Sequence, residues 1–404
     1  MRAARLRGWA AAAAALVLLA ACAPGGASDS SDPAAPSTDG AASPGTPTSA
    51  ADGHASAGTA RPKPVPLRSG EKRLTLTMPV EYTPSAPTGV GTDDYRCFLL
   101  DPELARDSYL TGTNVLPGNP DVVHHVILFR VNPGQVPAAE RKDASEPGEG
   151  WTCFGGTGLA GDFTNLDDAN WLGAWAPGGR ESVARPGYGV DLPRGSQIIM
   201  QVHYNLLAGD SPDASSAQIR VAPHSAGLTP LHTFLMPAPV ELPCRPGHDA
   251  SPLCDRDAAV ADVKTRFGDG PGSTNDLLYF LCGGKPAPSA VTSCTRRVLQ
   301  PMTILGVAGH MHLLGRSIRI ETNPGTPEAK TILDIPVWDF DNQGSKPIPP
   351  VHLDPADTVK VTCRHVQWLR DELPAFEGQE ERYVVWGEGT TDEMCLGILQ
   401  VAFG

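Results

Sequence analysis

Residues 122–131 read Val-Val-His-His-Val-Ile-Leu-Phe-Arg-Val, a dense run of apolar residues around two adjacent histidines. A second run, residues 196–207, reads Ser-Gln-Ile-Ile-Met-Gln-Val-His-Tyr-Asn-Leu-Leu. Short apolar runs that are rich in β-branched residues and bounded by turn residues predict buried strands. Each run therefore places imidazole rings within a predicted β-sheet, and the fold and a candidate site both follow from these two stretches.

Other short apolar segments surround these runs and are separated by turn residues. The chain has 404 residues, of which 43 are glycine and 40 are proline, and this composition favours turns and short strands over long helices. The further expected strands are residues 74–78, 302–307, 317–322, 358–363 and 396–403. Many short strands between turn residues predict an all-β sandwich architecture.

The length of the chain suffices for two domains, and the strand pattern breaks at residues 222–230. We expect an N-terminal domain over residues 68–225 and a C-terminal domain over residues 226–404. Residues 243–295 are rich in Gly and Pro and hold four cysteines, so we interpret them as an insertion into the second domain. Within the insertion, residues 255–267 fit a short helix.

The N-terminus has the features of an exported lipoprotein. Three arginines precede an apolar stretch, residues 9–21, which is short for a membrane-spanning helix. The stretch ends in Leu-Ala-Ala-Cys at residues 19–22 and resembles a bacterial lipobox, in which Cys22 is acylated after cleavage. The alternative is an ordinary secretory signal with a chance cysteine. We expect a lipoprotein signal peptide with its lipidated cysteine over residues 1–22, and extracytoplasmic anchoring to the cell membrane.

Residues 23–67 contain almost no large apolar side chain and consist mainly of Gly, Ala, Ser, Thr and Pro. Such a segment cannot bury enough surface to offset the entropy of ordering it. It predicts a disordered tether between the anchor and the folded part.

Apart from Cys22, the chain has eight cysteines, and an even number in an exported chain predicts up to four disulfides. They are Cys97, Cys153, Cys244, Cys254, Cys282, Cys294, Cys363 and Cys395. Within the insertion, neighbouring cysteines suggest the pairs Cys244–Cys254 and Cys282–Cys294, although spacing alone does not determine connectivity. A cysteine-based metal site is disfavoured because the chain has no Cys-x-x-Cys motif.

Several classes of function are disfavoured. The formal net charge is −13 without basic clusters, which argues against nucleic-acid binding. The chain has no His-Glu-x-x-His and no Gly-x-Ser-x-Gly motif, and it supports no phosphate-binding loop or Rossmann dinucleotide site.

Five of the eleven histidines lie in three apolar segments, and they are His124, His125, His203, His310 and His312. Buried imidazoles need hydrogen bonds or a metal ion, although a lone histidine is usually a satisfied core or surface residue. Residues i and i+2 of a strand share a face, whereas adjacent residues point to opposite faces. Both histidines at 124 and 125 therefore reach one metal only at a bulge, at a strand end or with accommodating rotamers. This spacing indicates a metal site and leaves zinc and copper open.

Four segments occur in an order that resembles the copper type II, ascorbate-dependent monooxygenase family, to which peptidylglycine α-hydroxylating monooxygenase and dopamine β-monooxygenase belong. The segments are Asp-Val-Val-His-His-Val-Ile-Leu-Phe (121–129), Gln-Val-His-Tyr (201–204), Gly-His-Met-His-Leu-Leu-Gly (309–315) and Thr-Thr-Asp-Glu-Met-Cys (390–395). Each segment alone is a weak motif. The resemblance covers residues 74–403 outside the insertion.

The resemblance implies two copper ions per chain and two tandem domains of the jelly-roll type of β-sandwich, with one copper site on each. His124, His125 and His203 match the electron-storing copper site of the family. The residues His310, His312 and Met394 match its catalytic, oxygen-binding copper site. A thioether ligand suits Cu(I) better than zinc, although filling a gap in the core is the commoner role of methionine.

The resemblance also implies the disulfides Cys97–Cys153 and Cys363–Cys395, and it places Tyr95 and Gln201 close to the ligands. One departure concerns the substrate. Ala308 and Ile398 stand where the peptide-hydroxylating branch has an arginine and a tyrosine that hold the substrate carboxylate, so a peptidylglycine substrate is not expected.

The activity implied is hydroxylation of a C–H bond in a small-molecule or peptide-like organic substrate. O₂ and a one-electron donor such as ascorbate would be co-substrates, and we expect a monomer. One alternative is an extracytoplasmic copper-binding lipoprotein without turnover, although seven methionines are few for a copper buffer. A zinc hydrolase is a third interpretation, and Met394 argues against it.

Overall fold

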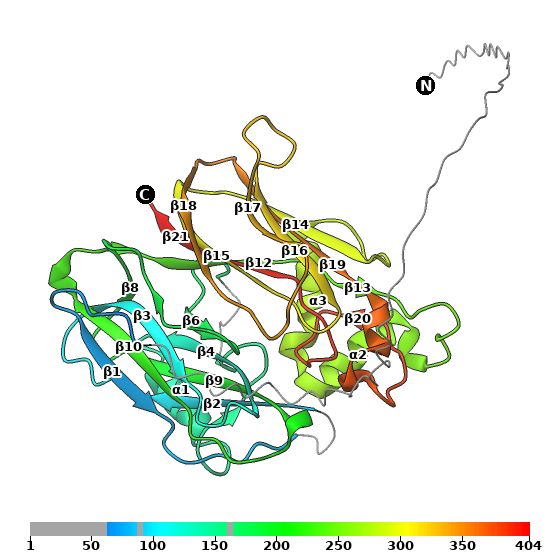
Figure 1. The fold of residues 1–404 in the computed structure, drawn as a ribbon, viewed down its shortest axis with the longest axis horizontal. Coiled ribbons are helices and arrows are strands. Elements are labelled where there is room, and N and C mark those ends of the chain that lie inside the picture. The colour runs from blue at the N-terminus through cyan, green and yellow to red at the C-terminus, as the bar shows by residue number, and fades with distance from the viewer. Residues whose placement is uncertain (1–62, 87–91, 160–164) are drawn as a thin grey trace, which may run out of the picture. The chain divides into compact units, whose positions relative to one another are not determined.

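The computed structural model describes residues 63–86, 92–159 and 165–404. The expected all-β class is confirmed, because strands dominate these residues (Figure 1). The signal peptide, Cys22 and nearly all of the expected tether lie outside the described residues. Within the described part of the chain, no helix is long and apolar enough to cross a membrane.

Two sheets from the first part of the chain enclose one hydrophobic core. The six-stranded sheet has the order β1 (Lys72–Thr77), β10 (Ser216–Pro223), β3 (Ser108–Leu116), β8 (Tyr188–Leu192) and β11 (Thr229–Pro230), with β7 (Ser182–Val183) paired to β3. The five-stranded sheet has the order β5 (Trp151–Thr152), β2 (Asp93–Leu100), β9 (Gln197–Asn205), β4 (Val123–Val131) and β6 (Trp171–Trp175). Apolar residues of both sheets, such as Ile219 and Val126, pack into the same cluster.

Two further sheets enclose a second core. One has the order β12 (His232–Pro237), β21 (Leu396–Phe403), β15 (Met302–His310) and β18 (Lys346–Leu353). The other has the order β14 (Val291–Arg297), β19 (Thr358–His365), β16 (Gly315–Thr322) and β17 (Lys330–Ile335). Ile304 and Leu399 of the first sheet pack with Ile318 and Val361 of the second. The expected boundary at residues 225/226 lies close to the change from the first pair of sheets to the second and stays a prediction.

All seven stretches expected as strands form strands, with ends that differ by a few residues. The short helical elements are α1 (Val136–Asp143), η1 (Leu206–Ala208), η2 (His224–Ala226), η4 (Gln367–Asp371) and η5 (Pro374–Phe376).

The insertion folds into η3 (Pro252–Cys254) and two helices, α2 (Arg256–Phe267) and α3 (Asp269–Cys282), beside the small sheet of β13 (Glu241–Leu242) and β20 (Val384–Val385). The expected helix over residues 255–267 is confirmed as α2, and the Asp255 side chain caps it by accepting a hydrogen bond from the Ala258 amide. The sequence did not predict α3.

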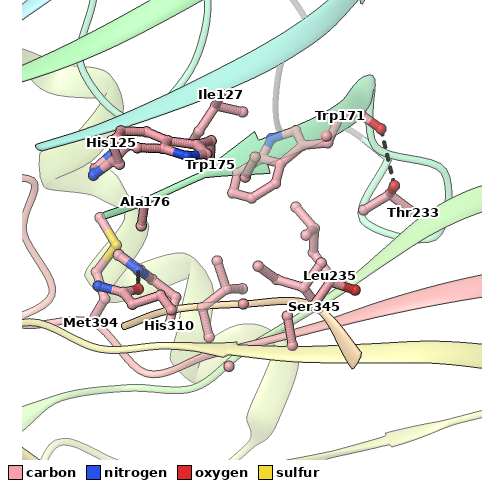
Figure 2. Close-up of a pocket in the computed structure, with 18 of the residues that line it drawn as sticks. His125, Ile127, Trp171, Trp175, Ala176, Thr233, Leu235, His310, Ser345 and Met394 are labelled. Carbon is pink, nitrogen blue, oxygen red and sulfur yellow. Dashed lines mark hydrogen bonds between the residues drawn. The ribbon is translucent and has the colours of Figure 1, made fainter. Parts of the chain in front are cut away.

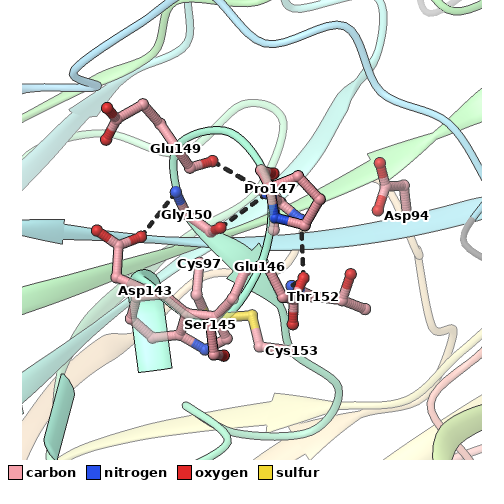
Figure 3. Close-up of polar contacts among 12 residues, drawn as sticks. Asp94, Cys97, Asp143, Ser145, Glu146, Pro147, Glu149, Gly150, Thr152 and Cys153 are labelled. Carbon is pink, nitrogen blue, oxygen red and sulfur yellow. Dashed lines mark hydrogen bonds and ion pairs between the residues drawn. A yellow bond between two sulfur atoms is a disulfide. The ribbon is translucent and has the colours of Figure 1, made fainter. Parts of the chain in front are cut away.

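The structure contains the four expected disulfides, Cys97–Cys153, Cys244–Cys254, Cys282–Cys294 and Cys363–Cys395. Near the first of them, Arg96 organises the loop between α1 and β5, of which Figure 3 labels Glu146, Glu149 and Gly150. Its guanidinium donates to the carbonyls of Gly150 (2.7 Å) and Glu149 (3.1 Å) and pairs with Glu146 (3.1 Å). The charge of Arg96 is thus compensated although its side chain is buried.

Candidate metal centres and the cavity between them

An irregular strand pairing brings the three N-terminal histidines together. Strands β4 and β9 are antiparallel, and His125 lies directly opposite His203. The register shifts between Val123 and His125, so the pairing is irregular at His124. A bulge was one of the conditions expected to let adjacent histidines bind one metal. At such an irregularity, neighbouring side chains no longer point to opposite faces of the sheet.

The Nδ1 atoms of these three rings converge on one point. His124 lies 3.2 Å from His125 and 3.3 Å from His203, and the third pair, His203 and His125, is also 3.2 Å apart. A tetrahedral ion with metal–nitrogen bonds of about 2.0 Å keeps its ligand atoms about 3.3 Å apart. The three nitrogens therefore already have the spacing of metal ligands, and the residues fit a bound ion.

Residues around these rings hold their orientation. The Nε2 atom of His203 lies 2.8 Å from Oδ1 of Asp93, and the Tyr95 ring stacks on the His203 ring with centroids 4.1 Å apart. The His124 ring stacks on Phe340. Burial would raise the pKa of Asp93, but hydrogen bonds with His203 and Thr390 outweigh it and hold this pKa below its ordinary value. A carboxylate on the distal nitrogen is the usual support of a metal-binding histidine.

The second set of expected ligands lies where β15 and β21 meet. His310 ends β15 and pairs with Leu396, so Met394, two residues before Leu396, reaches the same end of the strands. His312 follows in the turn before β16. The rings of His310 and His312 have centroids 5.1 Å apart, and Nδ1 of His310 lies 2.6 Å from Oε1 of Gln343.

A buried carboxylate connects the two segments that carry these ligands. Glu393 accepts hydrogen bonds from the backbone amides of His312 (3.0 Å), Leu314 and Met394 (3.2 Å). Nε2 of His365 lies 3.3 Å from the same carboxylate. Sequence reasoning included Glu393 in a motif without giving it a role, and it did not single out His365.

Burial favours the neutral form of three candidate ligands, His125, His310 and His312. It lowers the pKa of His310 to about 3 and lowers that of His312. The pKa of His125 also lies well below its ordinary value, because of burial and then the neighbouring histidines. Neutral imidazole is the form that binds a metal ion, so these rings do not have to lose a proton at physiological pH.

Both candidate centres border one cavity of about 640 Å³ (Figure 2). His125 lines it, as do His310, His312 and Met394. The ring centroids of His125 and His310 are 6.1 Å apart, so the two centres are neighbours across the cavity. Ala308 and Ile398, which pair across β15 and β21, also line it.

The two residues expected near the ligands differ in what they contact. Tyr95 stacks on His203 as described and donates its hydroxyl to the Glu388 carbonyl, 2.9 Å away. Gln201 lines the cavity, and its amide donates to the Gly156 carbonyl at 2.7 Å. It therefore holds the loop that follows the Cys97–Cys153 disulfide.

The insertion supports the segment that carries Met394. Arg266 of α2 forms two hydrogen bonds with the buried carboxylate of Asp392, at 2.7 and 2.8 Å. Asn275 of α3 binds both the amide and the carbonyl of Trp386, each at 3.0 Å. The insertion also reaches the cavity, because its α3 residues Leu277, Leu278 and Leu281 line it.

Removing the Cys363–Cys395 disulfide should lower the free energy of unfolding by about 4 kcal/mol, because the bond closes a loop with a sequence separation of 32 residues. A Cys363→Ser, Cys395→Ser variant should also bind Cu(I) more weakly, since Cys395 follows Met394. Urea unfolding and Cu(I) competition measure the two effects. The matched variant Cys244→Ser, Cys254→Ser should keep its Cu(I) affinity, and an equal loss in both variants would contradict a specific role for Cys395.

Comparisons with known proteins leave the family of the chain open. No family model matches it, and no curated protein matches it. An allantoicase structure is 11% identical over 73% of this chain and 77% of its own, with a TM-score of 0.16. The VP2 subviral particle of infectious bursal disease virus is 7% identical over 85% of this chain and 75% of its own, with a TM-score of 0.19. Such scores carry no argument about fold or function.

Proposed function

We propose that this chain is a copper-dependent monooxygenase that resembles the copper type II, ascorbate-dependent family, with two jelly-roll domains and one copper on each. His124, His125 and His203 would hold one copper, and His310, His312 and Met394 the other. The observation that carries the proposal is the convergence of three Nδ1 atoms at 3.2–3.3 Å, next to a second set of ligands on the same cavity.

The donor set supports copper over zinc. The second centre would combine two neutral imidazoles with a thioether, and thioethers select Cu(I). Glu393 supports this assignment because it ties the His312 turn to the Met394 segment and leaves little freedom to either. A methionine that only fills the core would not require a buried carboxylate that bonds to both the His312 and the Met394 backbone.

When bound, two copper ions would supply one-electron chemistry with O₂ and an external donor such as ascorbate. The protein's own residues contribute orientation and shielding. Asp93 and Tyr95 fix the His203 ring, while Gln343 fixes the His310 ring. The apolar wall that includes Trp171 and Leu235 would limit the access of bulk water to a substrate between the centres.

The disulfides support an extracytoplasmic location, because such bonds persist in oxidising compartments. The proposal therefore keeps the lipid anchor at Cys22, with the folded part outside the cytoplasm. The proposal also includes a monomeric chain and a one-electron donor such as ascorbate.

Copper stoichiometry tests the proposal. The purified full-length chain, stripped with a chelator and reloaded, should contain two copper ions by elemental analysis. A His310→Ala, His312→Ala variant should contain one, because the three-histidine centre is unaffected. The control His224→Ala, His352→Ala changes two exposed histidines and should keep both.

The same preparations separate binding from turnover. The loaded chain should consume O₂ with ascorbate in the presence of a substrate, and the variant with one copper should not. Two bound copper ions without any turnover would support a copper-binding lipoprotein instead. A chain that retains zinc, or that binds one copper or none, contradicts the monooxygenase proposal.

A further inference from the structure

The cavity borders both candidate centres, and a molecule bound where His125 faces His310 would lie beside both. His125 is on one side, and His310 and Met394 lie at the same end of the cavity on the other (Figure 2). The volume of about 640 Å³ lies within the range of sites that bind drug-sized molecules. Its lining therefore determines which class of molecule can occupy the position between the centres.

The walls are largely apolar and come from both parts of the chain. The first part supplies Ile127 and the indole rings of Trp171 and Trp175 (Figure 2). The second part supplies Leu235 and Ile398. Leu235 and Trp171 belong to one hydrophobic cluster, so this wall continues from one sheet pair to the other.

Helix α3 adds a further apolar wall. Leu278 is buried in the same cluster as Leu235, and Leu281 lines the cavity. The position of the helix is fixed at two points, since Asn275 binds the Trp386 backbone and Cys282 is bonded to Cys294 of β14. An occupant would meet a defined surface at this end.

Charged side chains contribute little to the lining. Besides the histidines, the described lining residues that are ordinarily charged at neutral pH are Arg180, Glu181 and Glu388. Glu181 pairs with Arg73 at 2.6 Å, and Arg180 is exposed to solvent. Burial raises the pKa of Glu388 to about 8, so this carboxyl is mainly uncharged at neutral pH.

Polar but uncharged groups line another part of the cavity. Asn342, Gln343 and Ser345 lie in the segment between β17 and β18, and the Gln343 carbonyl oxygen already bonds to His310. An occupant with an apolar skeleton and an uncharged hydrogen-bonding group would match both kinds of surface. A charged occupant would lose its hydration without gaining a buried ion partner.

We propose that the substrate of this site is an uncharged, mainly apolar molecule with a single polar group, held between the tryptophans of β6 and the leucines of α3. The inference rests on the proposed function in taking the cavity as the substrate site. It concerns binding alone, so it can be tested on the protein without metal.

Three probes of one skeleton test the proposal. They are 4-phenylbutan-1-ol, 4-phenylbutanoate and 4-phenylbutylamine, which are neutral, anionic and cationic at pH 7. Calorimetric titration of the metal-free, full-length chain should show the alcohol binding at least about tenfold more tightly than either ion, because burial of an unpaired charge is costly. Equal or tighter binding of either ion, or no binding of the alcohol, overturns the inference.

A charge placed on the wall should reverse the preference. In Ala308→Arg the anion should bind more tightly than the alcohol, since Ala308 lines the cavity two residues before His310. The matched control Val337→Arg adds the same charge at a residue that is 59% exposed, and it should keep the preference for the alcohol. If both variants keep that preference, the probe binds elsewhere and the inference fails. If Ala308→Arg does not fold, the ranking in the unaltered chain decides.

The two proposals fail in different ways. A chain that binds two copper ions but prefers an ionic probe keeps the proposed function and loses this inference. A metal-free chain that prefers the alcohol but takes up no copper keeps the apolar binding site and loses the proposed function.

Discussion

In a Met394→Leu variant, the Cu(I) affinity of one of the two centres should fall by more than about 100-fold, while the three-histidine centre keeps its copper. Leucine has a similar volume, so the apolar cluster around residue 394 stays filled and the change removes mainly the thioether. Loss of residues that merely orient a ligand already costs 10–100-fold in metal affinity, and loss of a ligand should cost more. Competition with a Cu(I) chelator measures the affinity.

A spectroscopic signal separates the thioether from packing. The X-ray absorption spectrum of the Cu(I) form should show sulfur scattering that disappears in Met394→Leu. The matched variant Met302→Leu alters a buried methionine at the opposite end of β15 and should keep both the affinity and the sulfur signal. If Met394→Leu behaves like Met302→Leu, residue 394 only fills the core.

Replacing Asp392 by asparagine should lower the free energy of unfolding by about 3 kcal/mol or more at pH 7. Asp392 is buried and pairs with Arg266 (2.7 Å) and Arg382 (3.0 Å). Its loss leaves these two partly buried cations with the more exposed carboxylate of Asp262, which lies 2.7 Å from Arg266 and 3.9 Å from Arg382. Urea unfolding of the metal-free chain measures the change. The substitution also releases α2 from the Met394 segment, so Cu(I) affinity should fall in the same variant.

An exposed ion pair provides the comparison. Arg319 and Asp334 pair at 3.1 Å with side chains that are 50% and 48% exposed. Asp334→Asn should leave the free energy of unfolding almost unchanged, because solvent screens the pair. Similar losses in the two aspartate variants would mean that the contact between the insertion and the Met394 segment contributes little.

The fold was predictable where strands carry dense apolar runs. Strands β4, β9, β15 and β21 have such runs, and each forms where it was expected. Strand β2 was not anticipated, because it begins Asp-Asp-Tyr-Arg, a run of charged residues that does not resemble a buried strand. Arg96 finds its ion partner, Glu146, 50 positions along the chain at 3.1 Å.

Helix α3 was unpredictable for a related reason. It begins Asp-Gly-Pro-Gly, a composition typical of turns. Its helical state is supported by tertiary contacts such as the Asn275 bonds to Trp386. The sequence of the α3 segment alone does not predict a hydrogen bond to Trp386, which lies 111 positions further along the chain.

The candidate ligands and Tyr95 came from motifs, whereas Asp93 and Gln343, which also orient ligands, did not. Asp93 precedes His203 by 110 positions and Gln343 follows His310 by 33, so only folding reveals these contacts. The Nδ1 atoms of His124 and His125 can converge because the strand pairing is irregular at His124. The spacing of the two histidines in the sequence does not predict this irregularity. Apolar spacing predicts which face of a strand is buried, but it does not predict where the pairing slips.

Asp93 touches both halves of the candidate site. Its Oδ1 atom contacts both Nε2 of His203 and the hydroxyl of Thr390, and its Oδ2 atom accepts a hydrogen bond from the Thr390 amide. Thr390 lies four residues before Met394. An ion that draws charge from His203 alters the carboxylate on which the Thr390 turn depends, so occupancy of one centre should change the affinity of the other. Thermodynamic linkage makes such an effect reciprocal, and the factor by which the first ion alters binding of the second must equal the factor in the opposite order.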